Sequence, residues 1–292
     1  MTTAAILLSL ATICGCIAVA CVAIAFATDC WLEYDVNRIA ILNTINQQST
    51  ALNPATLDFA NVAREMNRSN IYFDRTYGLW RQCFPSEIPY GTNVYLSPTD
   101  TSCVNIDYPK DLDSDLDGYE RARIHLMRTI IALFIAAFAV ELLCFLVGVF
   151  GCWKRSPALL ITTGTFMLTA WLLDAGALAI WHGVDYMETH QMNRRPYYLA
   201  WPLLLQQNTV RMYSWSFILA WIGCGFALLC AIFIFAGAGS LRYERRKEKE
   251  RHAQYVMPVY GAYAEKQPPY YAPGAHAYSG PYYYYNTNTY RY

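Results

Sequence analysis

Apolar residues gather in four long, almost uncharged windows along this chain of 292 residues. A helix that crosses a bilayer needs about 20 such residues, and each window reaches that length. The pattern therefore predicts four transmembrane helices joined by more polar segments. The predicted helices cover residues 1–28, 129–152, 157–182 and 213–239. The segments around them are a first loop 29–128, a turn 153–156, a second loop 183–212 and a tail 240–292.

A cleavable signal peptide is the alternative interpretation of the first window. Ala25-Phe26-Ala27 resembles the small-residue site at which such peptides are cut. However, no Lys or Arg precedes Arg38, and the window is longer than the apolar region of a signal peptide. We therefore expect the first helix to be retained in the mature protein.

Basic residues near the helix ends predict the orientation. The turn between the second and third helices contains Lys154 and Arg155, and six further cations follow the fourth helix between Arg242 and Arg251. Because basic residues next to membrane helices stay in the cytoplasm, both termini are expected inside, with the two loops outside. The first loop is acidic, with 14 acidic and 8 basic residues over 29–125, whereas the tail has 8 basic and 4 acidic residues. The sequence thus predicts a multi-pass plasma-membrane protein.

The composition excludes several functional classes. The chain is 55% hydrophobic, only 15% charged and formally neutral, which is poor in charge for a soluble domain and gives no reason to expect nucleic-acid binding. No nucleophile elbow, phosphate loop or zinc-helix motif occurs in a polar segment. We expect no enzymatic activity, no cofactor and no metal site.

Three of the ten cysteines lie outside the membrane in this topology. Cys83 and Cys103 are well inside the first loop, where the oxidising exterior lets them pair, whereas Cys30 adjoins the first helix and is left over. The segments 70–77 and 101–108 have the composition of strands, so a disulfide between them would hold together a small extracellular sheet. Asn67-Arg68-Ser69 is an N-glycosylation acceptor on the same side.

Several of these residues form a known signature. Trp31 follows the first helix, Gly78-Leu79-Trp80 precedes Cys83 by three residues, and Cys103 completes the pattern. This arrangement resembles the W…GLWxxC…C signature of the claudin superfamily, which contains the claudins, the peripheral myelin protein group and the gamma subunits of calcium channels. Arg121 or Arg123 resembles an arginine that these families place before the second helix.

The resemblance covers residues 1–241 and implies a fold. That fold is an all-α transmembrane four-helix bundle, left-handed, with a small extracellular antiparallel β-sheet built mainly from the first loop. It also implies that the indoles of Trp31 and Trp80 anchor the sheet on the bundle, and that Cys83 pairs with Cys103.

The chain departs from barrier-forming claudins in its loop lengths. Between Trp31 and Gly78 lie 46 residues, and between Cys83 and Cys103 lie 19. The long loop, the acceptor Asn67 and Arg81 are closer to the gamma-subunit branch and to invertebrate, nematode claudin-like proteins. The residues do not separate these branches.

Two sets of acidic residues invite functional interpretations. Glu141 and Asp174 lie within membrane windows, where we expect protonated, hydrogen-bonded side chains that join helices, with a shared proton as the alternative. Asp113, Asp115 and Asp117 match the start of a calcium-binding loop, but Ile124 stands where the closing Glu should be. We therefore expect a hydrated acidic rim there.

The tail is a low-complexity segment with 13 Tyr and 5 Pro from residue 240 onward, and we expect it to be disordered. Pro268, Pro269 and Tyr271 form a PPxY candidate ligand for WW domains. Tyr290 and Tyr292 form a candidate PDZ ligand at the terminus. The basic cluster 245–251 is expected to contact anionic membrane lipid, although its role as a topology signal would explain it equally.

Two functional hypotheses follow. In the first, the protein acts in cell–cell junctions, adhesion or a barrier, through loops that contact claudin-like proteins in the same membrane and on the next cell. In the second, it is an auxiliary subunit that regulates the gating or trafficking of a channel or receptor pore subunit. The apolar segment 199–205 in the second loop is expected to be an exposed contact in either case. We favour the junctional hypothesis.

Overall fold

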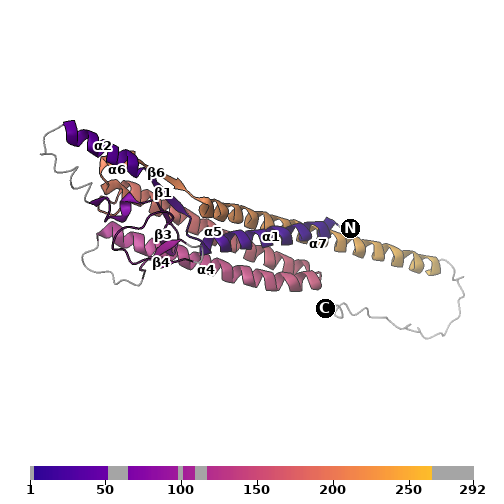
Figure 1. Cartoon of the computed structure of the whole chain (residues 1–292). Coiled ribbons are helices and arrows are strands. Elements are labelled where there is room, and N and C mark those ends of the chain that lie inside the picture. Colours follow the sequence, from indigo (N-terminus) through magenta and orange to yellow (C-terminus); the bar gives the residue numbers. More distant parts are fainter. Residues whose placement is uncertain (1–2, 52–64, 98–100, 109–116, 265–292) are drawn as a thin grey trace, which may run out of the picture.

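The structure is a computed structural model, and it describes residues 3–51, 65–97, 101–108 and 117–264. Within 48–51 and 254–264 it describes the backbone only. Four long helices run along the molecule, and the strands gather at one end of it (Figure 1). The long helices are α1 Thr3–Ala27, α4 Gly118–Trp153, α5 Pro157–His190 and α7 Trp215–Ala264.

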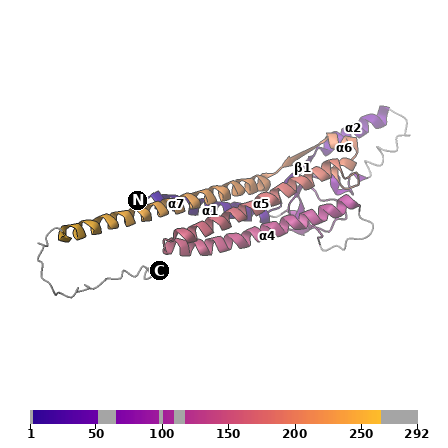
Figure 2. The ribbon, with the colours of Figure 1, turned by 180° about the vertical axis from the view of Figure 1, so that it is seen from behind.

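All four long helices are apolar enough over a sufficient length to cross a membrane. Helix α1 packs along α7, α4 packs along α5, and α5 also contacts α7. The prediction of a four-helix transmembrane protein is confirmed, and Figure 2 shows the same pairing from behind.

Three of the helices are longer than the apolar windows indicated. Helix α4 begins at Gly118 rather than at 129, and α5 continues to His190 rather than ending at 182. At 1.5 Å per residue, the 36 residues of α4 span about 54 Å, well beyond a hydrocarbon core of about 30 Å. A capping box of Asp117 and Glu120 starts α4 in the polar region, where a hydropathy pattern cannot detect it.

The fourth helix differs most from its predicted bounds. It begins at Trp215 and continues to Ala264, so the backbone of 240–264 is helical rather than disordered as expected. Lys, Arg and Glu are good helix formers, and they dominate the residues that follow the apolar window. The tail motifs at 268–271 and 290–292 lie outside the described residues.

A six-stranded antiparallel sheet crosses one end of the bundle in the order β4-β5-β3-β2-β1-β6. Its strands are β1 Leu32–Val36, β2 Arg75–Tyr77, β3 Arg81–Phe84, β4 Tyr95–Leu96, β5 Ser102–Asn105 and β6 Thr209–Tyr213. Five strands come from the first loop, which confirms the predicted sheet. The sixth, β6, comes from the second loop and pairs with β1 from Leu32↔Tyr213 to Val36↔Thr209.

The segment 70–77 is only partly a strand. Its first part is a 3-10 helix, η1 Asn70–Tyr72, and only Arg75–Tyr77 pairs in the sheet. The cause is Arg75, whose Nη1 donates to the backbone oxygens of Asn70, Ile71 and Phe73 at 3.0–3.1 Å and so folds the chain back on itself. The second predicted strand, 101–108, contains β5.

Helix α2 Arg38–Ala51, the 3-10 helix η2 Tyr198–Ala200 and the short helix α6 Leu203–Gln207 lie at the far end of the sheet region. Figures 1 and 2 both show α2 and α6 next to each other there. We call this end the tip. The segment 199–205 is not a uniformly exposed patch as expected, because Trp201 and Leu205 are buried while Leu203 remains exposed.

The turn between α4 and α5 is unusually tight. Ser156 N–H donates to the oxygen of Gly151 and Arg155 N–H donates to that of Cys152, the two hydrogen bonds of a Schellman motif. The motif requires a left-handed residue, usually Gly, and here that residue is Arg155 with φ 47°. A non-glycine residue in this conformation costs roughly 1–2 kcal/mol.

Candidate functional site

The signature residues cap the end of α1. The last four carbonyls of a helix lack partners within it. In α1 each of them is satisfied by a residue from outside the helix or just beyond its end. Thr28 Oγ1 donates to Ile24 O at 2.7 Å, Trp31 Nε1 to Ala25 O at 2.7 Å, Trp80 Nε1 to Phe26 O at 2.9 Å and Arg81 Nη2 to Ala27 O at 3.4 Å. The signature therefore joins the sheet to the first membrane helix.

Trp31, which directly precedes β1, also packs against the three long helices other than α1. Its side chain is fully buried, and its ring lies 4.9 Å from that of Trp181, 5.8 Å from Phe134 and 5.8 Å from Phe217. These rings belong to α5, α4 and α7 respectively. Trp31 is therefore the centre of the core that connects the sheet with the bundle.

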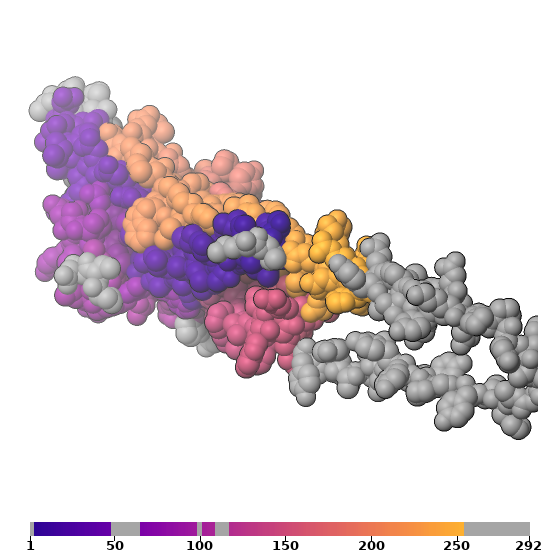
Figure 3. All heavy atoms as spheres, turned by 90° about the vertical axis from the view of Figure 1, so that its right-hand side faces the viewer, coloured from indigo at the N-terminus to yellow at the C-terminus, as the bar shows by residue number. Residues whose placement is uncertain are grey.

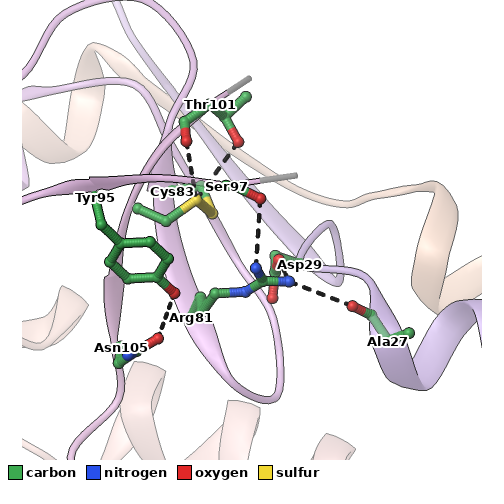
Figure 4. The surroundings of a disulfide bond; sticks show 9 residues. Ala27, Asp29, Arg81, Cys83, Tyr95, Ser97, Thr101 and Asn105 are labelled. Atoms are coloured by element: carbon green, nitrogen blue, oxygen red, sulfur yellow. Dashed lines mark hydrogen bonds and ion pairs between the residues drawn. A yellow bond between two sulfur atoms is a disulfide. The ribbon is translucent and has the colours of Figure 1, made fainter. Parts of the chain in front are cut away.

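Gly78 permits the close approach of the β2–β3 turn to the end of α1. A Cβ atom at this position would stand 2.4 Å from Asp29 Cα, a distance that no side-chain rotation can relieve. The same turn brings Arg81 within 2.6 Å of the Asp29 carboxylate (Figure 4). Burial raises the pKa of Asp29, and the hydrogen bond and charge of Arg81 oppose that rise.

The disulfide lies one strand away from this junction. Cys83 on β3 and Cys103 on β5 face each other in the ladder, and their sulfurs are bonded (Figure 4). The predicted pairing is therefore present, and Cys30 is a free, partly buried thiol. The bond crosslinks β3, whose Arg81 contacts α1, with the outer part of the sheet.

The structure separates the two candidate arginines at the start of α4. Arg121 is exposed, whereas Arg123 is largely buried, forms an ion pair with Glu188 of α5 and lies under the ring of Tyr197. A second ion pair joins Arg211 of β6 to Asp185 of α5. Of the two arginines, Arg123 is therefore the one that faces inward, and two ion pairs hold the C-terminal part of α5 against its neighbours.

Arg75 is a residue whose importance was not apparent from the sequence. It is 3% exposed, packs 4.3 Å from the ring centre of Tyr34 and 4.9 Å from that of Trp201, and has no described carboxylate partner. Burial lowers its pKa. A cavity of about 30 Å³ between Arg75, Arg123 and Tyr197 has room for about one water molecule. An arginine in a strand-like segment gives no sequence signal of such burial.

The remaining predicted residues have varied surroundings. Asn67 is exposed, and its side-chain oxygen accepts from Arg38 at 2.9 Å; its glycosylation stays a prediction. Glu141 and Asp174 are buried at 6% and 0% exposure, but their carboxylate oxygens have no hydrogen-bond partner among the described residues. The hydrogen bonds that we expected these acids to make between helices are therefore not found.

The candidate calcium-binding residues are only partly described. No group of three His, Cys, Asp or Glu side chains in the part of the chain that the structure describes is arranged to hold a metal ion. Asp113 and Asp115 lie outside the described residues, and Asp117 caps α4.

The tip carries a groove of about 440 Å³ between the end of β1, the start of α2 and the β6 side of the sheet. Its walls combine exposed apolar side chains, Ile39 and Val210, with the carboxylates of Asp35, Asp74 and Glu87. Leu203 on α6 is also 68% exposed. An apolar surface of this kind, on the part of the molecule farthest from the basic end of α7, is suited to protein contact.

The comparisons with known proteins agree with the geometry. A family model described as "PMP-22/EMP/MP20/Claudin tight junction" matches residues 16–236, which is more than half of the chain. No curated protein matches the chain.

Proposed function

This chain belongs to the PMP-22/EMP/MP20/claudin family, and from that premise we propose that it acts in cell–cell contact through its tip. In this proposal, the tip of one copy binds the tip of a second copy on the adjoining cell. The protein is a multi-pass membrane protein with four membrane helices. The bundle holds the tip away from the bilayer, and no chemical step is involved.

The observation that carries the proposal is the groove at the tip together with the exposed aliphatic side chains in and beside it. Ile39 is 73% exposed, Leu203 68% and Val210 55%, values that water-facing aliphatic side chains rarely reach together in one region. The groove wall also carries Arg38, which pairs with Glu87, and the carboxylates of Asp35 and Asp74, so it presents both signs of charge. A two-fold contact between copies can therefore place a cation of each opposite an acid of the other.

The proposal includes the orientation expected from the basic residues. Lys154 and Arg155 at one end of the bundle, and the cations of α7 beyond it, would lie in the cytoplasm. The tip and Asn67 would then face the exterior of the plasma membrane, where Asn67 can receive a glycan.

Aggregation of cells that express the chain tests the proposal. Cells without other junction proteins should aggregate when they express the wild type, and the double variant Ile39→Gln/Leu203→Gln should lower the aggregated fraction several-fold, because it removes apolar contact area from both sides of the interface. Surface biotinylation should show equal delivery of both proteins.

Leu96→Gln is the matched control, because Leu96 is also 68% exposed but lies on β4, at the opposite edge of the sheet from β6. This variant should aggregate cells as the wild type does. Equal aggregation by the double variant and the wild type would contradict the proposed contact, as would a wild type that does not aggregate cells.

Helix α2 favours a second candidate function, that of an auxiliary subunit. It follows β1 within the long first loop, and its exposed Ile39 and Leu42 could rest on the outer surface of a channel or receptor. Affinity purification from native tissue separates the two functions. A channel pore subunit that co-purifies with the wild type and is lost with Ile39→Gln would favour the auxiliary role.

A further inference from the structure

The end of the molecule opposite the tip carries a concentrated set of cations. Figure 3 views the molecule from this end, and Figures 1 and 2 show that the polar part of α7 continues past the ends of α4 and α5. Six exposed cations belong to it: Lys154, Arg155, Arg242, Arg245, Arg246 and Lys249. None of them takes part in an ion pair within the described part of the chain.

Four of the six cations of α7 lie on one face of the helix. Positions 242, 245, 246 and 249 follow the i, i+3, i+4, i+7 spacing that places residues on one side. Lys247 and Arg251 lie on the other side together with Glu244 and Glu248, and Glu250, four residues after Arg246, borders the four-cation face. A topology signal requires only that cations be present and does not require that four of them share a face.

A direct contact brings the α4–α5 turn to this face. Arg245 Nη2 donates to the backbone oxygen of Arg155 at 2.6 Å. The turn with its two cations therefore lies against the face of α7 that carries the other four, although the two segments are far apart in sequence. We call these six residues the basic cluster.

The strained turn is a second, independent observation. Arg155 occupies the left-handed position that favours Gly, and its side chain is exposed, so packing does not explain the presence of Arg. Strained backbone positions cluster at functional sites such as ligand clamps. Trp153, next to the turn, is 81% exposed, as expected of an indole at the membrane–water boundary.

We propose that the basic cluster binds the headgroup of a polyphosphoinositide in the adjacent leaflet. Six exposed cations on two adjoining segments match a headgroup that concentrates several negative charges on one inositol ring. Lipids with a single net charge would have to gather several molecules to satisfy the same cations. The site is independent of the contact proposed at the tip, and it gives the protein a means of responding to the phosphoinositide content of its membrane.

The test uses the full chain in nanodiscs of neutral lipid, titrated with a short-chain phosphatidylinositol bisphosphate. Short-chain phosphatidylserine at equal total charge and free inositol trisphosphate are the comparison ligands. The bisphosphate lipid should bind at least tenfold more tightly than either of them, because the basic cluster can contact several phosphates at once and the acyl chains hold the headgroup at the membrane.

Two charge-matched double variants locate the site. Arg242→Gln/Arg246→Gln removes two cations from the four-cation face and should weaken binding by roughly tenfold or more. Lys247→Gln/Arg251→Gln removes the same charge from the opposite face and should weaken it by less than about threefold.

Arg155→Gly separates binding from folding. Gly relieves the left-handed strain, so this variant should be more heat-stable than the wild type and yet bind the lipid more weakly. Equal losses for the two double variants, or equal affinity for the bisphosphate lipid and charge-matched phosphatidylserine, would overturn the proposal. Equally tight binding of free inositol trisphosphate would overturn the assignment to a membrane lipid.

Discussion

The sheet region and the membrane bundle hold their elements together by different means. The sheet region uses directional polar contacts: the disulfide, the Asp29–Arg81 ion pair, and Arg75 with its three backbone acceptors. In the bundle, α1 packs on α7 through small residues. Ala4, Ala11, Ala18 and Ala25 recur every seven residues on α1 and are at most 3% exposed.

The difference follows from the solvent around each region. Lipid tails are as apolar as the helices, so burial of apolar side chains does not drive helices together, and small residues are needed for close backbone packing. Gly223 illustrates this, since a Cβ there would stand 2.7 Å from Val22 of α1. In water the apolar core forms readily, but the small sheet needs crosslinks.

The end of α1 lies at the boundary between the membrane bundle and the sheet region. Its final carbonyls leave the apolar layer and must find hydrogen-bond donors, which Trp31, Trp80 and Arg81 provide. The positive charge of Arg81 also complements the negative end of the helix dipole. Substitutions at this boundary should therefore destabilise mainly the sheet region.

The largest effect is expected from loss of the disulfide. Cys83 and Cys103 are 20 residues apart, and closing a loop of this size stabilises by roughly 3 kcal/mol in the chain-entropy model. Cys83→Ser and Cys103→Ser should cause the same loss of surface delivery, and the double variant should be no worse than either. Cys30→Ser is the control and should do little; if it matched Cys83→Ser while Cys103→Ser behaved as wild type, the pairing would be wrong.

Gly78→Ala should cause the next largest loss of stability. Its new methyl group would meet backbone at Asp29, so the β2–β3 turn must shift, at a cost of about 1–3 kcal/mol. In Gly164→Ala, the three atoms nearest to the new methyl group all belong to the ring of Phe235, a side chain that can move, so this variant should lower the melting temperature less. The measurement is thermal unfolding of both variants in detergent micelles. A larger drop in melting temperature for Gly164→Ala than for Gly78→Ala would contradict this prediction.

Trp80→Phe removes the donor to Phe26 O while retaining an aromatic ring. The unsatisfied carbonyl should lower the stability by roughly 1–2 kcal/mol. Trp153→Phe changes an indole that is 81% exposed and should have no measurable effect. Limited proteolysis of the first loop reports the result, and equal cleavage rates in the two variants would argue against the capping role of Trp80.

Arg155→Gly should give the smallest change, and in the opposite direction. Relief of the left-handed strain should stabilise the α4–α5 turn by about 1 kcal/mol. Arg155→Lys keeps the strain and should melt like the wild type. A Gly variant that melts below the wild type would show that the Arg155 side chain stabilises the turn through contacts that outweigh the strain.

The candidate site was predicted from sequence in part. The pairing of Cys83 with Cys103 and the anchoring by Trp31 and Trp80 came from the resemblance, because the signature names these residues. The hydrogen bonds from Trp31 and Trp80 to α1 were not predicted. Trp80 and Phe26, for example, are 54 positions apart, and no local pattern connects them. Arg75 was missed for the same reason, because its acceptors depend on a fold of the chain that it helps to create.

The sequence by itself determined the four membrane helices and their connecting segments. A bilayer requires apolar residues over a set length of chain, and such a stretch can be recognised directly in the sequence. Only the tertiary structure decided where α4, α5 and α7 end, and that β6 completes the sheet beside β1. It also decided which arginine is buried and that the basic turn meets the basic face of α7. These features depend on contacts between distant segments, which local hydropathy and spacing do not encode.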